Sequence, residues 1–191
     1  MVDEPGAAPE SGTRARTRRA ILDAGVRVLS QQSSASLAEV AAAAGVGRTT
    51  MHRYFPERAD LLTGITNDLL EQVAAATERA RPEAGPAVAA LERLCQAYFA
   101  LGDGLLLALN EPHLFTDPAW NEESEPDRAL LRLVERGHAE GTMDPDLSPG
   151  WVQTVLWSLL YAAWMYARDS DVPEHDALAL CLCTLRKAVA P

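Results

Sequence analysis

The chain has 191 residues, of which 48% are hydrophobic and 23% are charged, and its formal net charge is −10 at pH 7. This length suffices for one large or two small domains with a buried core, and no apolar run is long enough to cross a bilayer. The acidic, proline-containing N-terminus excludes a secretory signal, and three cysteines without metal-ligand spacing predict reduced thiols in a cytoplasm.

The charge is unevenly distributed along the chain. Residues 1–12 carry three carboxylates, whereas residues 13–62 carry eight arginines and four carboxylates, a net +4. Residues 63–191 carry nine basic and twenty acidic side chains, a net −11. A basic region on an acidic chain is expected when only that region meets a polyanion.

The N-terminal third begins with a tail that we expect to be disordered (1–12), followed by a helix over residues 13–31. Arginines crowd the first turns of this helix, where cations oppose the helix dipole. A nearby phosphate would relieve that repulsion, and a solvated arginine-rich helix end is the alternative. The arginines concerned are Arg14, Arg16, Arg18 and Arg19.

Residues 36–55, SLAEVAAAAGVGRTTMHRYF, predict two short helices joined by a tight turn. Ser36 and Glu39 have the spacing of a capping box, and Gly45 ends the first helix because glycine enters the left-handed conformation without strain. A helix-turn-helix uses its second helix, here residues 48–54, to read the major groove. Its outward residues are predicted to contact base edges, against the alternative of a solvated face: Arg48, Thr49, Thr50, His52 and Arg53. Ser36, Tyr54 and Arg58 are predicted to contact phosphate, with a core position as the alternative for Tyr54.

Residues 44–62, AGVGRTTMHRYFPERADLL, resemble the signature of the tetracycline-repressor-like (TetR) family of regulators. That pattern is a helix-turn-helix, an aromatic-basic-aromatic-Phe ending, and a Pro or Asn turn into a long fourth helix. Gly47 replaces a frequent serine, and His52 and Tyr54 exchange the places that their residue types usually take. Which of these two rings reaches DNA is therefore open. The resemblance implies dimerisation through an intermolecular four-helix bundle.

The remaining chain is helical in its pattern. We expect a long helix over 57–81, further helices over 86–102, 105–109, 126–140, 148–167 and 174–189, and a loop over 110–125. The predicted fold class is all-α, with a three-helix head (13–62) joined by the long helix to a C-terminal ligand-binding and dimerisation domain (63–191). Glycines at 102 and 104 are expected to break the helical pattern.

Two sets of residues are candidates for binding in the C-terminal domain. Aromatic and methionine side chains predict an apolar ligand pocket, with plain core or dimer interface as the alternative: Tyr98, Trp120, Trp157, Tyr161 and Met165. A helix that is apolar nearly all round needs a second partner, and the last two helices of two copies would form a four-helix bundle. The interface candidates are Trp151, Val155, Leu159, Leu178, Leu182 and Leu185.

These patterns predict a cytoplasmic, homodimeric transcriptional regulator, most simply a repressor, that binds a palindromic operator in double-stranded DNA and a small apolar or amphipathic effector. Alternatives are an activator, a regulator without a ligand, and a helical small-molecule-binding protein whose head does not bind DNA. We expect no enzyme activity, cofactor or metal site, because no nucleophile motif, phosphate-binding loop or ligand cluster is present. His113, His138 and His175 have no metal-site spacing and are expected at or near the surface.

Overall fold

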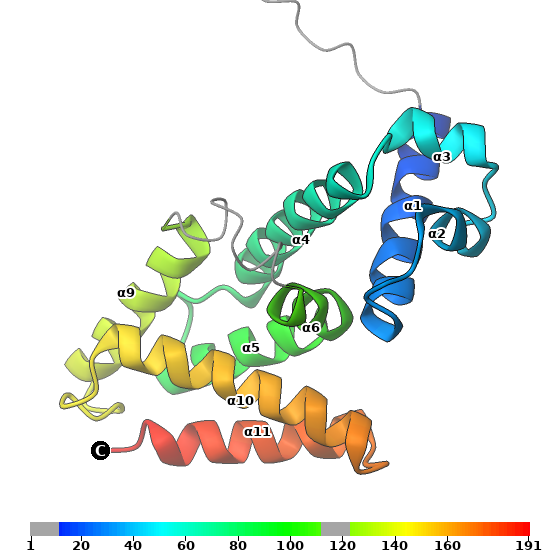
Figure 1. The fold of residues 1–191 in the computed structure, drawn as a ribbon. Coiled ribbons are helices and arrows are strands. Elements are labelled where there is room, and N and C mark those ends of the chain that lie inside the picture. Colours follow the sequence, from blue (N-terminus) through cyan, green and yellow to red (C-terminus); the bar gives the residue numbers. More distant parts are fainter. Residues whose placement is uncertain (1–11, 112–122) are drawn as a thin grey trace, which may run out of the picture. The chain divides into compact units, whose positions relative to one another are not determined.

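The computed structural model describes residues 12–111 and 123–191, and every regular element in these ranges is an α-helix (Figure 1). The all-α prediction is therefore confirmed. The helices are α1 (Gly12–Gln31), α2 (Leu37–Ala43), α3 (Arg48–Tyr54), α4 (Arg58–Ala80), α5 (Ala87–Phe99), α6 (Gly102–Asn110), α9 (Glu125–Ala139), α10 (Pro149–Asp169) and α11 (Glu174–Ala188). The chain divides into two compact units, Met1–Ile65 and Thr66–Pro191.

The first unit is a helical head built from α1, α2, α3 and the first turns of α4. Its core consists of apolar side chains that recur at helical spacing and are almost fully buried: Ile21, Leu22, Val40, Met51, Phe55, Leu61 and Ile65. The predicted capping box at the start of α2 is present, since the Ser36 hydroxyl accepts from Glu39 N and the Glu39 carboxylate accepts from Ser36 N. Gly45 has a φ of 68°, which is the left-handed conformation expected of it.

The second unit contains α5, α6, α9, α10, α11 and the remainder of α4. Helices α10 and α11 pack against each other along their length, and both contact α5 (Figure 1). The centre of this unit is filled by buried leucines and valines from four helices: Leu91, Leu94, Leu130, Leu133, Val134, Leu156, Leu160 and Leu185. Among the described residues, no helix is both long enough and apolar enough to cross a membrane.

Helix α6 begins earlier than its sequence predicts. We expected Gly102 and Gly104 to interrupt the helical pattern, yet both lie inside α6. A Cβ on Gly102 would come within 2.7 Å of Trp164 Nε1, and a Cβ on Gly104 within 2.9 Å of a Leu69 methyl. The glycines therefore allow side chains of α10 and α4 to approach the α6 backbone. The indole of Trp164 uses that approach to donate to Phe99 O at 3.1 Å.

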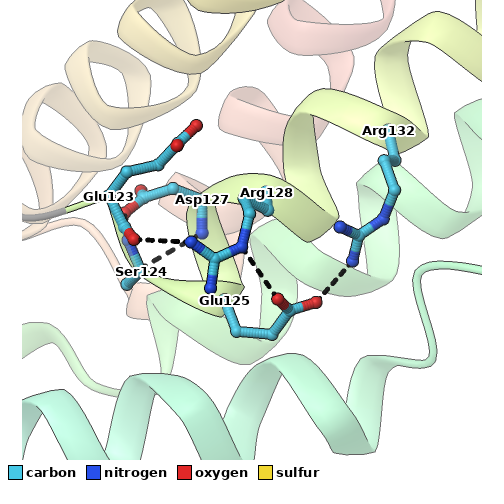
Figure 2. Close-up of polar contacts among 6 residues, drawn as sticks. All are labelled: Glu123, Ser124, Glu125, Asp127, Arg128 and Arg132. Carbon is cyan, nitrogen blue, oxygen red and sulfur yellow. Dashed lines mark hydrogen bonds and ion pairs between the residues drawn. The ribbon is translucent and has the colours of Figure 1, made fainter.

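Helix α9 also starts before the predicted position. Its N-cap is Ser124, whose hydroxyl accepts from Asp127 N while Asp127 Oδ2 accepts from Ser124 N, a second capping box (Figure 2). The other oxygen of Asp127 accepts from Gln153 Nε2 of α10 at 2.6 Å. One carboxylate thus both caps α9 and joins it to α10.

An ion-paired group flanks this cap on the exposed side of α9. Glu125 accepts from Arg128 at 3.0 Å and from Arg132 at 2.5 Å, one and two turns further along the helix (Figure 2). The two guanidinium groups lower the pKa of the Glu125 carboxyl, because they bind its charged form. This group is exposed, so its effect on stability is small.

Candidate nucleic-acid interface and effector site

Helix α3 presents a basic, solvent-exposed face. Met51 is buried and fixes the orientation of the helix, while Arg48, Thr49, His52 and Arg53 are exposed and Thr50 is half-buried. No carboxylate lies in the first turn of α3. All five residues predicted to contact bases therefore lie on one short helix, and four of them are freely accessible to a groove.

His52 and Tyr54, whose roles the sequence leaves open, have different surroundings. The Tyr54 hydroxyl donates to Arg14 O at 3.3 Å, and the Arg53 guanidinium lies 5.5 Å from the Tyr54 ring centroid. His52 is exposed, and its Nδ1 lies 3.1 Å from Pro56 O. Because a carbonyl oxygen only accepts, Nδ1 is the donor in this contact. Tyr54 thus joins α3 to α1, whereas His52 offers its ring outward.

Arg58 has a structural role in addition to its predicted one as a phosphate ligand. Its Nη1 donates to Ala35 O at 2.8 Å and its Nη2 donates to Ser33 O at 2.5 Å, both in the loop between α1 and α2. The side chain is half-buried. Arg58 therefore clamps the start of α4 to that loop, and a phosphate contact by Arg58 stays a prediction. The acceptors lie 23 and 25 residues away, so the neighbouring residues carry no signal for this clamp.

Ser36 has a structural role alongside its predicted one. Its hydroxyl donates to Glu39 Oε2 at 2.7 Å in addition to accepting from Glu39 N. The Ser36 backbone N–H and the Ser36 hydroxyl, both donating to Glu39 Oε2, lower the pKa of Glu39, since they stabilise its carboxylate. The residue is exposed, so its backbone and hydroxyl lie at the surface of the head. A phosphate contact by Ser36 remains a prediction.

The predicted pocket residues are partly brought together in the second unit. Tyr98 of α5 and Trp157 of α10 stack with ring centroids 5.1 Å apart and an interplanar angle of 9°. The Tyr161 hydroxyl donates to Asn110 Oδ1 of α6 at 3.4 Å, and Met165 is half-buried one turn further along α10. Trp120 lies outside the described residues, as does His113. The stack and the Tyr161–Asn110 contact therefore link α5, α6 and α10.

The hydroxyl of Tyr98 is buried, and its hydrogen-bond partner, Thr77, was not predicted from the sequence. Thr77 donates to Val73 O, so its hydroxyl accepts from the Tyr98 hydroxyl at 2.7 Å. Burial raises the pKa of Tyr98 to about 12. The phenol therefore stays neutral in the folded protein at pH values where it ionises in the unfolded chain.

This shift predicts a loss of stability at high pH. The stabilisation by neutral Tyr98 is complete below pH 10, the ordinary pKa, and is lost as the pH rises toward about 12. The loss amounts to about 2 to 3 kcal/mol, at 1.36 kcal/mol per pKa unit. Urea unfolding between pH 8 and 12 should show that the free energy of unfolding falls less steeply with pH for Tyr98→Phe than for the parent protein. Tyr166→Phe, which removes an exposed phenol, should keep the parent profile; identical slopes for all three proteins would contradict the assignment.

The predicted interface residues differ in accessibility. Trp151 is 56% exposed, and Val155, Leu159, Leu178 and Leu182 are half-buried. Leu185, in contrast, is fully buried within its own protomer and cannot meet a partner; its inclusion was wrong, because it faces the packed side of α11. Two further exposed apolar residues on the same helices, Tyr166 and Leu180 at 46% and 55%, were not among the predicted interface residues.

The structure describes two of the three histidines that were predicted at or near the surface. His175 is exposed and lies 3.3 Å from Asp176, and His138 is half-buried near the end of α9. Across residues 12–111 and 123–191, no group of three His, Cys, Asp or Glu side chains is arranged to hold a metal ion.

Comparison with known proteins connects this geometry with a family. Residues 21–65 match the model of the bacterial regulatory proteins of the tetR family. The chain is 39% identical over 181 residues, 94% of either protein, to the HTH-type transcriptional repressor LfrR of Mycolicibacterium smegmatis.

Solved structures give the same relationship. The crystal structure of the TetR-like regulator LfrR from Mycobacterium smegmatis in complex with proflavine has a TM-score of 0.75 at 37% identity, covering 92% of this chain and 98% of that one. A putative TetR-family regulator from Rhodococcus sp. has a TM-score of 0.72 at 19% identity, covering 91% and 98%, and supports the fold alone. With the helix-turn-helix and its basic face in place, the chain belongs to the tetR family of bacterial regulatory proteins and is a DNA-binding transcriptional regulator, not an enzyme.

Proposed function

We propose that this regulator is a cytoplasmic repressor that binds a palindromic operator as a homodimer and is released by a small planar aromatic cation. The exposed basic face of α3, in the only basic region of an acidic chain, carries the DNA part of this proposal. Arg48 and Arg53 can each donate two hydrogen bonds to guanine or bind phosphate. The methyl groups of Thr49 and Thr50 can contact the methyl group of thymine. The repressor activity of LfrR supports the sign of regulation.

The dimer part of the proposal is supported by the outward apolar residues of α10 and α11. Trp151 and Leu180 are each more than half exposed in the single chain, and Tyr166 nearly so. Burying such residues against a second copy would form a four-helix bundle with twofold symmetry. A twofold dimer presents two identical recognition helices, and a palindromic operator matches that symmetry.

The effector part is supported by the Tyr98–Trp157 aromatic stack and by the negative net charge of the C-terminal region. Proflavine, the molecule bound to LfrR, is a flat tricyclic ring system that carries positive charge. In the present chain Tyr98 and Trp157 supply nearly parallel aromatic faces, and the Tyr161–Asn110 pair supplies polar groups near the same helices. Residues 63–191 carry a net charge of −11, which favours a cation over an anion.

Ligand and DNA should weaken each other's binding. If the effector binds best to a conformation that suits the operator poorly, linkage requires that each weakens the other's affinity by the same factor. Typical coupling free energies of about 1–3 kcal/mol correspond to changes of roughly 5- to 150-fold in Kd. This coupling is the property that an experiment has to measure.

The test uses proflavine as the probe and a labelled DNA duplex from the region upstream of the protein's own gene. Proflavine fluorescence first measures binding to the protein alone, since the dye also intercalates into DNA. The fluorescence anisotropy of the labelled duplex then measures operator binding, at dye concentrations that do not change the anisotropy of the duplex alone. We expect proflavine to raise the operator Kd roughly 5- to 150-fold. Trp157→Ala should reduce this effect, and Trp157→Phe, which keeps a flat ring, should retain most of it.

Two outcomes would overturn parts of the proposal separately. Operator binding that is unchanged by saturating proflavine would remove the planar cation as effector while leaving the repressor assignment. Absence of any preferred duplex in a genomic footprint would remove the operator assignment and favour the alternative of a ligand-binding helical protein.

A further inference from the structure

Two buried cysteines from distant parts of the chain face each other in the second unit. Cys95 lies on α5 and Cys181 lies on α11, and their Sγ atoms are 3.7 Å apart. Cys95 is 0% exposed and Cys181 is 4% exposed. Both thiols are free, and neither belongs to the recognition helix or to the aromatic stack. Two thiols in van der Waals contact are a potential reaction site, because one can attack the other once either is oxidised.

Neighbouring contacts hold the two helices in this register. Arg186 of α11 donates to Glu92 Oε1 of α5 at 2.6 Å. Because Glu92 precedes Cys95 whereas Arg186 follows Cys181, the two helices run antiparallel past each other at this point. The ion pair and the cysteine pair are thus successive contacts along one α5–α11 seam, so the approach of the sulfurs follows from the packing of both helices.

We propose that Cys95 and Cys181 form an oxidation site at which a small hydroperoxide produces an intramolecular disulfide between α5 and α11. The sulfurs must approach by roughly 1.7 Å to reach the bond length of about 2.05 Å. Side-chain rotation with a small movement of one helix supplies a displacement of this size. The chemical class of the reagent follows from burial, because only a small uncharged oxidant can reach sulfurs that are almost fully enclosed.

The chemistry proceeds in two balanced steps. The Cys181 thiolate attacks one oxygen of the hydroperoxide, so that an S–O bond forms, the O–O bond breaks, and the departing alkoxide takes a proton to become an alcohol (water, for hydrogen peroxide). Cys95 then attacks the Cys181 sulfenic acid, so that the S–S bond forms, the S–O bond breaks, and the hydroxide leaves as water with the Cys95 proton. Two thiols lose two electrons, and the hydroperoxide gains them.

The two cysteines have different protonation tendencies that fit these roles. The hydrogen bond between the two sulfurs, in which either can be the donor, raises the pKa of Cys95 and lowers the pKa of Cys181, and burial adds to the rise at Cys95. Cys181 is also the less enclosed of the two, at 4% exposed against 0% for Cys95. Cys181 is therefore the better-placed nucleophile toward peroxide, and Cys95 is the resolving thiol.

Cys183 provides an internal contrast on the same helix. It is exposed, so bulky reagents such as glutathione disulfide should modify it while leaving the buried pair intact. Hydrogen peroxide, in contrast, should reach the pair. Reagent size thus separates oxidation at the proposed site from ordinary surface thiol chemistry.

The experiment treats the folded, full-length Cys183→Ser protein with hydrogen peroxide, then denatures it, alkylates the free thiols and digests it for mass spectrometry. We expect both remaining thiols to be consumed and a cross-linked peptide pair to appear, about 2 Da lighter than the sum of its parts and separated by dithiothreitol. Near-ultraviolet circular dichroism at the same peroxide concentration establishes that the protein remains folded. In the same Cys183→Ser background, Cys95→Ala should give no cross-linked peptide, and Cys181→Ala should leave Cys95 unoxidised.

The proposal is overturned if folded Cys183→Ser retains both thiols after peroxide treatment. It is equally overturned if Cys181 proceeds to sulfinic acid while Cys95 stays free, or if the cross-link joins two different chains. Should an alanine variant fail to fold, the cross-linked peptide from the Cys183→Ser protein still decides the question by itself.

Discussion

Replacing both Arg48 and Arg53 with alanine is expected to weaken operator binding by about 100-fold or more at physiological salt. Each arginine that binds a guanine or a phosphate contributes about 1–3 kcal/mol, and both side chains lie exposed on α3. The slope of log Kd against log salt concentration should also fall by about one for each phosphate that the variant no longer binds. Protein stability should change little, since Arg53 makes only a surface cation–π contact with Tyr54.

The measurement is a titration of the labelled operator at several salt concentrations, with a charge-matched control. Arg27→Ala combined with Arg79→Ala removes the same charge from exposed positions outside α3. This control should reduce only the small, sequence-independent electrostatic part of the affinity. If the Arg48/Arg53 double variant binds no worse than the control, α3 does not read the operator.

Replacing Arg58 with methionine is expected to lower the free energy of unfolding of the head by about 2–4 kcal/mol. The change leaves Ala35 O and Ser33 O without the guanidinium that now donates to them. Hydrogen bonds from a charged donor contribute about 1.5–3 kcal/mol each, and a buried acceptor left unpaired is costly. Methionine preserves the aliphatic length of the side chain, so the destabilisation isolates the clamp between α4 and the α1–α2 loop.

Chemical denaturation followed by circular dichroism measures this effect, and Arg48→Met is the matched control because Arg48 is exposed. The control should remain within about 0.5 kcal/mol of the parent protein, as surface substitutions usually do. Arg58→Lys should recover little, since one ammonium group cannot reproduce the fixed fork of a guanidinium. Unchanged stability of Arg58→Met, together with a smaller salt slope of operator binding, would return Arg58 to the role of a phosphate ligand.

The features that sequence predicted well are those set by neighbouring residues. The capping box of Ser36 and Glu39 spans three residues, and the left-handed conformation of Gly45 follows from its place between two short helices. Likewise, Ser148 accepts from Trp151 N at the start of α10, as the Ser-Pro pair predicts. Each of these depends on backbone geometry within one turn, and that information is fully present in the local sequence.

The features that sequence missed depend on tertiary contacts. The two glycines of α6 were predicted to break the helix because glycine has a low helix propensity. In the structure they lie within the helix, where the absence of a Cβ allows Trp164 and Leu69 to approach the backbone. Arg58 was predicted as a phosphate ligand from its place at a helix start, whereas its bonds to the α1–α2 loop involve residues 23 and 25 positions away. Cys95 and Cys181 are 86 residues apart, so their proximity depends on how α11 packs on α5. The surroundings of Tyr54 likewise depend on a distant contact, since its hydroxyl donates to Arg14 O, 40 residues away.

Helix α4 has two buried apolar faces, and the number of residues between them matters. Its early residues Leu61 and Ile65 are buried in the first unit, whereas Leu69 and Val73 are buried in the second. Both apolar faces belong to one continuous helix, in which each residue adds a rotation of about 100° and a rise of about 1.5 Å. Inserting or deleting one residue between Ile65 and Leu69 would therefore change by about 100° the direction in which α4 presents Leu69 and Val73 relative to Leu61 and Ile65. The number of residues between Ile65 and Leu69 thus sets the angle between the two apolar faces of α4, whereas loop lengths beyond α4 leave this angle unchanged.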